Sequence, residues 1–513
     1  MCGITFFVVS DGQGEEVKKH LERGLLKHRG PDASAVVVKD TFAMGFDRLA
    51  IVNLSDEGMQ PFSLGKHIMV ASGEIWNYRE LFHDDLRSDM DVIMRLFHSD
   101  SSWDSEEIKR NVGKLDGDFA FVIADDCDGA FVAARDHIGV RPLFYGTDEE
   151  GKVIAFASEA KGLVGGPGIT GVHVFPPGHF YSSREGVFVA YTACFYEGAD
   201  CLGGASVRGL LESAIKKRIE HSERPVGLLC SGGVDSSVIV AVAEAMPAGR
   251  DLHVFTVEYA DGHSDDAIYA RLLCEKLGLQ HTMVRFTAAD VRATIEPVIK
   301  ACETYDPNTI RAAIPMYLLA KHIAEKTDIK VILGGEGSDE CFGGYNYFQY
   351  SPSDDAVNDE TARLLRNIHM FDLLRADRCF AAHGLEVRAP FLDQSLVAFV
   401  GGLPGEKKVG DKELLRDAFK HLTTLGNLRI LERLKERLSD GCGFSYVPAL
   451  LNSLSPPDTG KLADKLKYEA TYYRGIFDGI YGEANSHWII QRELPDWPAL
   501  REIEGRAGQS LID

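Results

Sequence analysis

The chain is 513 residues long, which favours two domains of roughly 200 and 300 residues, because a single core rarely grows so large. Hydrophobic residues make up 45% and charged residues 26%, a composition typical of globular proteins and not of disordered or membrane proteins. The formal charge of -22 opposes general attraction to nucleic acid or anionic lipid. Length, composition and charge together favour an enzyme that acts on small molecules.

The ten cysteines are scattered along the chain, without a C-x-x-C pair or a metal-ligand spacing. We expect reduced thiols, as in cytoplasmic proteins. No apolar stretch approaches the roughly 18 residues of a membrane span, and the first residues lack the order of a signal peptide. The sequence therefore predicts a cytoplasmic protein that neither enters a membrane nor binds nucleic acid.

Up to about residue 195, short β-rich runs alternate with turn residues. The runs are Ile4–Val9, His67–Ala71, Phe119–Ala124 and Val153–Ala157. Helical pattern is sparse here, with candidates at Glu15–Lys27 and Asp89–Phe97. Residues 2–195 are thus predicted to form a mostly antiparallel, layered sheet domain.

From about residue 205, strands and helices alternate. The predicted strands are Val226–Cys230, His253–Tyr259, Thr282–Phe286 and Lys330–Leu333. The predicted helices are Ala205–Ile219, Ser237–Met246, Asp266–Leu277, Ala288–Cys302 and Ile314–Lys326. This order predicts a doubly wound α/β domain with a parallel sheet over residues 205–513, with added helices after about Asp411 and a glycine-containing linker at Glu197–Gly204.

Cys2 is a candidate nucleophile. We expect methionine aminopeptidase to remove Met1, because the side chain of Cys2 is small. The freed α-amine, with a pKa near 8, can accept the thiol proton, which an N-terminal nucleophile requires. A buried structural cysteine at the start of a strand is the alternative.

Four motifs follow Cys2 in order: His28-Arg29-Gly30-Pro31-Asp32, Arg48-Leu49-Ala50-Ile51-Val52, Ser72-Gly73-Glu74-Ile75-Trp76-Asn77 and Ser88-Asp89. The series resembles the class II glutamine amidotransferase family, whose domain has an Ntn-hydrolase fold. The resemblance implies catalysis by Cys2, Ser72 and Gly73, and glutamine binding by Arg48, Leu49, Ile51, Val52, Gly73, Glu74 and Asp89. The residue types agree, since a guanidinium binds a carboxylate and carboxylates recognise an ammonium.

Ser72 departs from this family, which usually has Asn at the position, with a side chain that helps to form the oxyanion hole. A Ser hydroxyl falls short of an Asn amide nitrogen by roughly 1.5 Å, one bond length. We therefore expect glutamine to be a poorer nitrogen donor than ammonium.

The segment Ser231-Gly232-Gly233-Val234-Asp235-Ser236-Ser237 follows an apolar strand and opens an apolar helix. Its backbone N–H groups and the helix N-terminus would form a phosphate site. It lacks the Lys of a Walker A loop and resembles the pyrophosphate loop of enzymes that split ATP into AMP and pyrophosphate. A tight turn with Ser caps is the alternative.

A second loop, Gly334-Gly335-Glu336-Gly337-Ser338-Asp339-Glu340, also follows an apolar strand and should lie at the same edge of the sheet. Asp235 and Asp339 are the predicted Mg²⁺ ligands, because ATP reacts as its magnesium complex and hard cations prefer oxygen. Helix capping is the alternative for either aspartate alone.

Further blocks resemble the asparagine synthetase family, and the resemblance covers nearly the whole chain: Glu303-Thr304-Tyr305-Asp306, Glu386-Val387-Arg388-Ala389-Pro390-Phe391-Leu392-Asp393 and Lys435-Glu436 with Ser439-Asp440-Gly441. It implies catalytic roles for Glu336 and Lys435, although the charges around Lys435 also fit a solvated helix face. It implies ATP binding by Leu229, Ser231, Gly232, Gly233, Asp235, Ser236, Val257, Gly334 and Gly335.

The activity implied by the resemblance converts aspartate, ATP and glutamine to asparagine through β-aspartyl-AMP and ammonia, which crosses an apolar passage between the domains. A β-lactam-forming relative is one alternative, but such relatives tend to lose the residues equivalent to Cys2 and Glu336. A glutamine- or nucleotide-binding regulator is another, to which Ser72 lends weight. A homodimer is also compatible with the resemblance.

Overall fold

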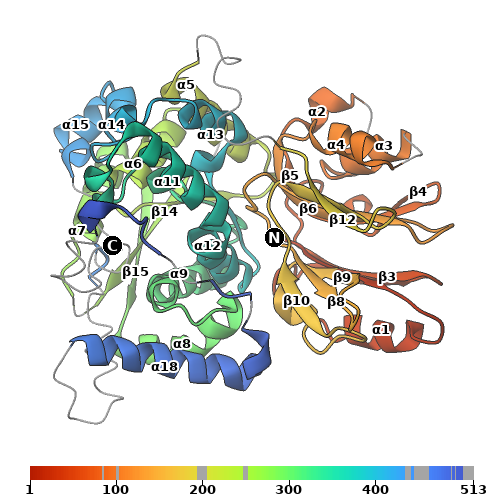
Figure 1. The fold of residues 1–513 in the computed structure, drawn as a ribbon. Coiled ribbons are helices and arrows are strands. Elements are labelled where there is room, and N and C mark those ends of the chain that lie inside the picture. Colours follow the sequence, from red (N-terminus) through yellow and green to blue (C-terminus); the bar gives the residue numbers. More distant parts are fainter. Residues whose placement is uncertain are drawn as a thin grey trace.

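The computed structural model describes residues 1–83, 86–99, 103–192, 205–246, 252–260, 262–433, 441–443, 462–486, 488–490 and 493–500. Figure 1 shows two halves side by side, with the N-terminal half in red to yellow and the C-terminal half in green to blue. The predicted mixed fold class is confirmed, because the first half is built on antiparallel sheets and the second on a parallel sheet. The predicted linker Glu197–Gly204 lies outside the described residues.

The N-terminal half contains two antiparallel sheets stacked on each other. In order across the first sheet, the strands are β10 (Gly171–Val174), β8 (Phe144–Thr147), β9 (Val153–Ala157), β1 (Gly3–Val8), β3 (Phe42–Arg48) and β2 (Ala33–Val38). Across the second sheet they are β12 (Val187–Ala190), β11 (His179–Ser182), β7 (Phe131–Arg135), β6 (Gly117–Asp125), β5 (His67–Ile75) and β4 (Phe62–Leu64). All four predicted strands are present, as β1, β5, β6 and β9.

Aromatic side chains fill the space between these sheets. The rings of Phe6 and Phe131 lie 4.9 Å apart, and Phe156 packs against both. Alternate residues of β5 and β6 face the opposite side, where α3 (Asp91–Ser99) and α4 (Ser105–Val112) cover them. The other α-helices described in this half are α1 (Gly14–Leu21) and α2 (Tyr78–Leu81). The predicted helix Glu15–Lys27 therefore ends early, before the left-handed Gly24.

The C-terminal half contains a parallel sheet. Its strands, in order, are β15 (Gln280–Phe286), β14 (His253–Tyr259), β13 (Val226–Leu229), β16 (Val331–Leu333) and β17 (Glu386–Arg388). One face packs against α5 (Val207–Glu220), α6 (Val234–Glu244), α7 (Asp265–Leu277) and α13 (Gln394–Gly401). The other packs against α8 (Ala288–Cys302), α9 (Pro307–Lys326) and α12 (Asp372–Ala381), and α18 (Leu462–Tyr481) packs on α8 and α9. The remaining α-helices among the described residues are α10 (Ser338–Phe342), α11 (Asp354–Asn367), α14 (Glu413–Phe419) and α15 (Thr423–Asn427).

The strand order positions the two glycine-rich loops. From β13 the chain continues to β14 on one side, whereas β16 lies on the other side. The loops after β13 and β16 therefore diverge at a topological switch point, where parallel sheets bind ligands. This is the edge at which the sequence places the nucleotide loops.

Local capping explains one difference from the predicted helices. Helix α9 begins at Pro307 and not at Ile314. Asp306 is its N-cap, accepting a hydrogen bond from the backbone N–H of Thr309 at 2.8 Å, and proline suits the first helical position.

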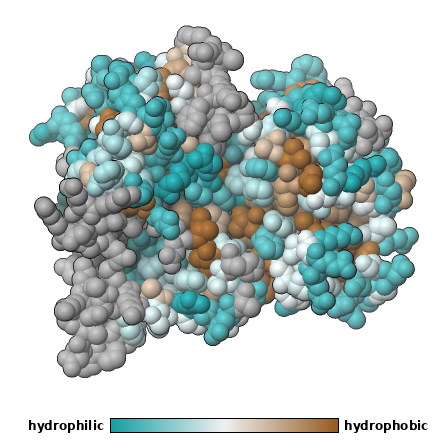
Figure 2. Space-filling view, in the orientation of Figure 1, coloured by the Kyte–Doolittle hydropathy of each residue, from teal (hydrophilic) through white to brown (hydrophobic). Residues whose placement is uncertain are grey.

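The two halves share buried surface. Leu49, Ile51, Ile138 and Val140 of the N-terminal half belong to a buried cluster whose other members come from the C-terminal half. Figure 2 shows hydrophilic residues over most of one face, with apolar residues gathered near the middle of the view, where the halves meet. None of the described helices is both long and apolar enough to cross a membrane.

Candidate active sites

A pocket at the start of β1 contains all of the residues predicted to bind glutamine. It is lined by Cys2, Arg48, Leu49, Ile51, Val52, Gly73, Glu74 and Asp89, together with Phe46, Gly58, Gln60, Ala71, Ser88, Met90 and Glu386. These residues come from the residue before β1, from β3 and the loop that follows it, from β5 and from the segment before α3, with Glu386 added from β17 of the other half. The fold therefore brings together motifs that lie far apart in the sequence.

The Cys2 thiol lies 3.4 Å from the backbone N–H of Leu49, which donates to it. Burial raises the pKa of this thiol to about 11, so the thiol needs a nearby base before it can attack. Met1 is also buried, and burial lowers the pKa of its α-amine to about 6. Removal of Met1 would make the backbone nitrogen of Cys2 the free α-amine of the chain.

The charged residues of this pocket are largely desolvated. The Arg48 guanidinium donates to the carbonyl oxygens of Ser55 and Asn53, and Asp89 accepts from the backbone N–H of Ile75 at 2.8 Å. Burial raises the pKa of Asp89 to about 6 and also raises the pKa of Glu74. Both carboxyl groups can therefore recognise an ammonium only where they remain ionised.

Ser72 and Gly73 lie on β5 next to Cys2. The Ser72 hydroxyl donates to the Cys2 carbonyl at 2.9 Å, and Ser72 is not among the residues that line the pocket. Gly73 has a φ of +134°, and a Cβ there would lie 1.9 Å from the carbonyl oxygen of Asp118, so only glycine fits. This arrangement agrees with a weakened oxyanion hole, which stays a prediction.

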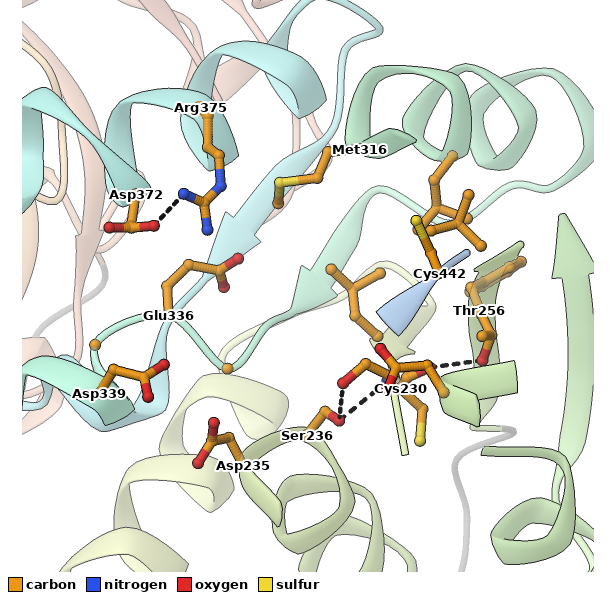
Figure 3. Close-up of a pocket in the computed structure, with 18 of the residues that line it drawn as sticks. Cys230, Asp235, Ser236, Thr256, Met316, Glu336, Asp339, Asp372, Arg375 and Cys442 are labelled. Atoms are coloured by element: carbon orange, nitrogen blue, oxygen red, sulfur yellow. Dashed lines mark hydrogen bonds and ion pairs between the residues drawn. The ribbon is translucent and has the colours of Figure 1, made fainter. Parts of the chain in front are cut away.

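A second pocket lies at the switch point of the parallel sheet, and Figure 3 shows its side chains converging from both glycine-rich loops and from α9 and α12. Its lining includes these predicted residues: Leu229, Ser231, Asp235, Ser236, Val257, Gly335, Glu336 and Asp339. The predicted residues Gly232, Gly233 and Gly334 lie in the turns beside the pocket and do not line it. Lys435 lies outside the described residues.

The first loop is held by its own side chains. The Ser236 hydroxyl accepts from the backbone N–H of Ser231 at 3.0 Å, while the Ser231 hydroxyl accepts from the N–H of Gly233 at 3.3 Å. Gly232 has a φ of +72°, and a Cβ there would lie 2.7 Å from the backbone nitrogen of Ala270. The close approach to α7 thus requires glycine, and the turn directs the N-terminus of α6 into the pocket.

Asp235 and Asp339 converge on a residue that the sequence analysis did not single out. The Lys412 ammonium lies 2.6 Å from an Asp235 carboxylate oxygen and 2.7 Å from one of Asp339. Two carboxylates that share one cation can also hold Mg²⁺, which binds few protein ligands and completes its shell with phosphate and water. Among the described residues no group of three or more His, Cys, Asp or Glu side chains forms a closed metal centre.

Comparison with known proteins agrees with this pair of pockets. The family model described as asparagine synthase matches residues 206–355 and 349–486, and the model of the glutamine amidotransferase domain matches residues 1–181. The chain belongs to the asparagine synthase family.

Three relatives share almost the full length of the chain with it. A probable asparagine synthetase (glutamine-hydrolyzing) of Acanthamoeba polyphaga mimivirus is 34% identical, over 96% of this chain and 97% of its own. The asparagine synthetase of Gallus gallus is 34% identical, over 97% and 96%. One from Lotus japonicus is 35% identical, over 96% and 88%.

Some residues in this pocket, or in contact with the side chains that line it, have no signal in the sequence. Lys412 lies in a left-handed conformation between Asp411 and α14, in a segment without a recognisable motif. Arg375 and Asp372 form an ion pair at the N-terminal end of α12, close to Glu336 (Figure 3). Only the tertiary fold brings such residues to the pocket or to its carboxylates, so spacing along the chain could not identify them.

Proposed function

We propose that this chain is a glutamine-dependent asparagine synthetase, an ATP-dependent carbon–nitrogen ligase. It converts aspartate, ATP and glutamine to asparagine, AMP, pyrophosphate and glutamate. The observation that carries the proposal is that one chain holds a pocket around Cys2 and a phosphate-loop pocket, and shares both family domains with relatives along nearly its full length.

In the first pocket, the Cys2 thiolate attacks the side-chain amide carbon of glutamine, and the α-amine of Cys2 takes the thiol proton. The backbone N–H of Gly73 donates to the oxyanion that forms. Collapse of the intermediate releases ammonia and leaves a thioester, which water hydrolyses to glutamate. Arg48 binds the α-carboxylate of glutamine, and Glu74 and Asp89 bind its α-ammonium.

In the second pocket, the side-chain carboxylate of aspartate attacks the α-phosphorus of ATP and displaces pyrophosphate, giving β-aspartyl-AMP. The amides of the loop at Ser231–Ser236 and the N-terminus of α6 donate to the phosphates. Mg²⁺ held by Asp235 and Asp339 would offset negative charge on those phosphates. Fixing both reactants can supply about 7 to 11 kcal/mol of the barrier.

Ammonia from the first pocket then attacks the acyl carbon of β-aspartyl-AMP and displaces AMP. We assign Glu336 to a position beside this intermediate and Lys435 to the α-phosphate. Leu229, Val257 and Gly335 contact adenosine, and Gly232, Gly233 and Gly334 shape the loops. We also propose domain bounds of 2–195 and 205–513, a cytoplasmic location and a homodimer.

Two activities in two pockets make the proposal testable. Cys2→Ala should abolish asparagine formation from glutamine, because the nucleophile is lost, yet leave the ammonium-dependent reaction largely intact. AMP, pyrophosphate and asparagine should form in equal amounts. Loss of both activities in a folded variant, or AMP formation that does not depend on aspartate, would contradict the proposal.

A further inference from the structure

The N-terminal half alone does not complete the glutamine pocket. Glu386 of β17 lines the pocket, and two residues further on Arg388 forms an ion pair with Glu74, with 2.9 Å between a terminal guanidinium nitrogen and a carboxylate oxygen. Both residues belong to the parallel sheet of the other half. The carboxylate assigned to the α-ammonium of glutamine therefore has a partner in the synthetase half.

The guanidinium of Arg388 is fully buried and held on several sides. Its Nε donates to Glu386 at 2.7 Å, and a terminal nitrogen donates to the carbonyl oxygen of Arg218 at 2.6 Å. Its charge also lies over the ring of Trp76, 5.1 Å from the centroid. These contacts fix the guanidinium, so its position relative to Glu74 is set by the fold.

The backbone of Arg388 contacts the second pocket. Arg388 is paired with Leu333 of β16, and its carbonyl oxygen accepts from the backbone N–H of Gly334 at 3.0 Å. Gly334 opens the loop that carries Glu336 and Asp339. One residue thus contacts the glutamine-binding carboxylate through its side chain and the nucleotide loop through its backbone.

We infer that Arg388 is a positioning residue for glutamine, which orients the Glu74 carboxylate toward the α-ammonium and joins this pocket to the Gly334 loop. The inference rests on the proposed function and deepens it. On this basis the glutamine pocket is competent only when the two halves are docked.

The charges around Glu74 support this role. Burial raises the pKa of Glu74, Arg388 is the strongest opposing influence, and Asp89 and Glu386 raise the pKa further while Arg141 lowers it. Without Arg388, Glu74 would stay protonated to a higher pH and would offer the ammonium no negative charge. The loss would appear as a displaced acidic limb in the pH profile of glutamine use.

The test compares Arg388→Met, Arg388→Lys and Arg218→Met in the full chain. Arg218 is a matched control, because it is also fully buried, lies 5.0 Å from the Trp76 ring centroid and pairs with acidic residues, Asp118 and Asp393, that do not line the pocket. The measurements are KM and kcat/KM for glutamine hydrolysis across pH, and the ammonium-dependent rate.

Arg388→Met should raise the KM for glutamine about 10- to 100-fold, as expected for a lost charge-assisted contact. This fold-change in KM should be at least about tenfold larger than any fold-change in the ammonium-dependent rate. Its acidic limb in kcat/KM should move to higher pH. Arg388→Lys should raise KM several-fold but keep the limb in place, because it retains the charge and loses the planar fork. Arg218→Met should change neither quantity.

An unchanged KM and acidic limb in Arg388→Met would overturn the inference, as would equal shifts in Arg218→Met. Should Arg388→Met fail to fold, Arg388→Lys decides alone, and a natural KM in that variant would overturn it. A natural protein that makes no asparagine from ammonium would instead refute the proposed function, since glutamine hydrolysis is measured without ATP or aspartate.

Discussion

Replacing Ser72 with Asn should increase glutamine hydrolysis. In the natural chain the Ser72 hydroxyl donates to the Cys2 carbonyl at 2.9 Å, which commits its proton away from the pocket. The oxyanion is then left with the Gly73 amide. An Asn side chain extends one bond further, roughly 1.5 Å, and brings a second donor within reach.

The expected gain follows from two opposing contributions. One oxyanion donor contributes about 2.7 to 4 kcal/mol to transition-state stabilisation. The substitution also breaks the hydrogen bond to Cys2, which costs about 0.5 to 1.5 kcal/mol. The net of about 1 to 3.5 kcal/mol corresponds to a roughly 10- to 400-fold higher turnover.

The assay is the steady-state release of glutamate at saturating glutamine, without ATP or aspartate. Ser72→Ala is the matched control, since it loses the hydrogen bond to Cys2 and gains no donor, so its turnover should not rise. Thermal unfolding would show whether the larger side chain fits at this buried position. No gain in Ser72→Asn, with fold and glutamine affinity unchanged, would mean that Ser72 or another group already completes the hole.

Lys412→Met should lower the free energy of unfolding by about 3 to 5 kcal/mol, because Asp235 and Asp339 lose the cation between them. Urea unfolding measures this loss, and added Mg²⁺ should recover part of it. Burial raises the pKa of Asp89 to about 6 and also raises the pKa of Glu74, so kcat/KM for glutamine should fall toward acidic pH as both carboxylates take up protons, the Asp89 step near pH 6, which a pH–rate profile would reveal. Burial lowers the pKa of Lys408 from 10.5 to about 8, so the unfolded chain binds more protons between these values. The Lys408 contribution to stability should therefore rise with pH across that window, by up to about 3 kcal/mol, as the difference between the natural chain and Lys408→Met.

Much of the fold follows from the sequence because its signals are local. The strand-turn-helix texture predicts the parallel sheet, and the glycines of the phosphate loop mark a turn that only they can form, as at Gly232. The contacts of Lys412 and Arg388 do not follow from local signals. Each reaches its partners across more than one element, and the spacing of residues along a chain carries no information on such contacts.

The buried cluster that contains Leu49, Ile51, Ile138 and Val140 has a consequence for synthesis on the ribosome. Its remaining members extend along the sequence as far as Ile430. At about 5–20 residues per second, the roughly 300 residues of the second half take about 15–60 s to appear. For that time the nascent first half exposes an apolar face with no partner of its own, so chaperones that hold such surfaces should bind it until the second half folds.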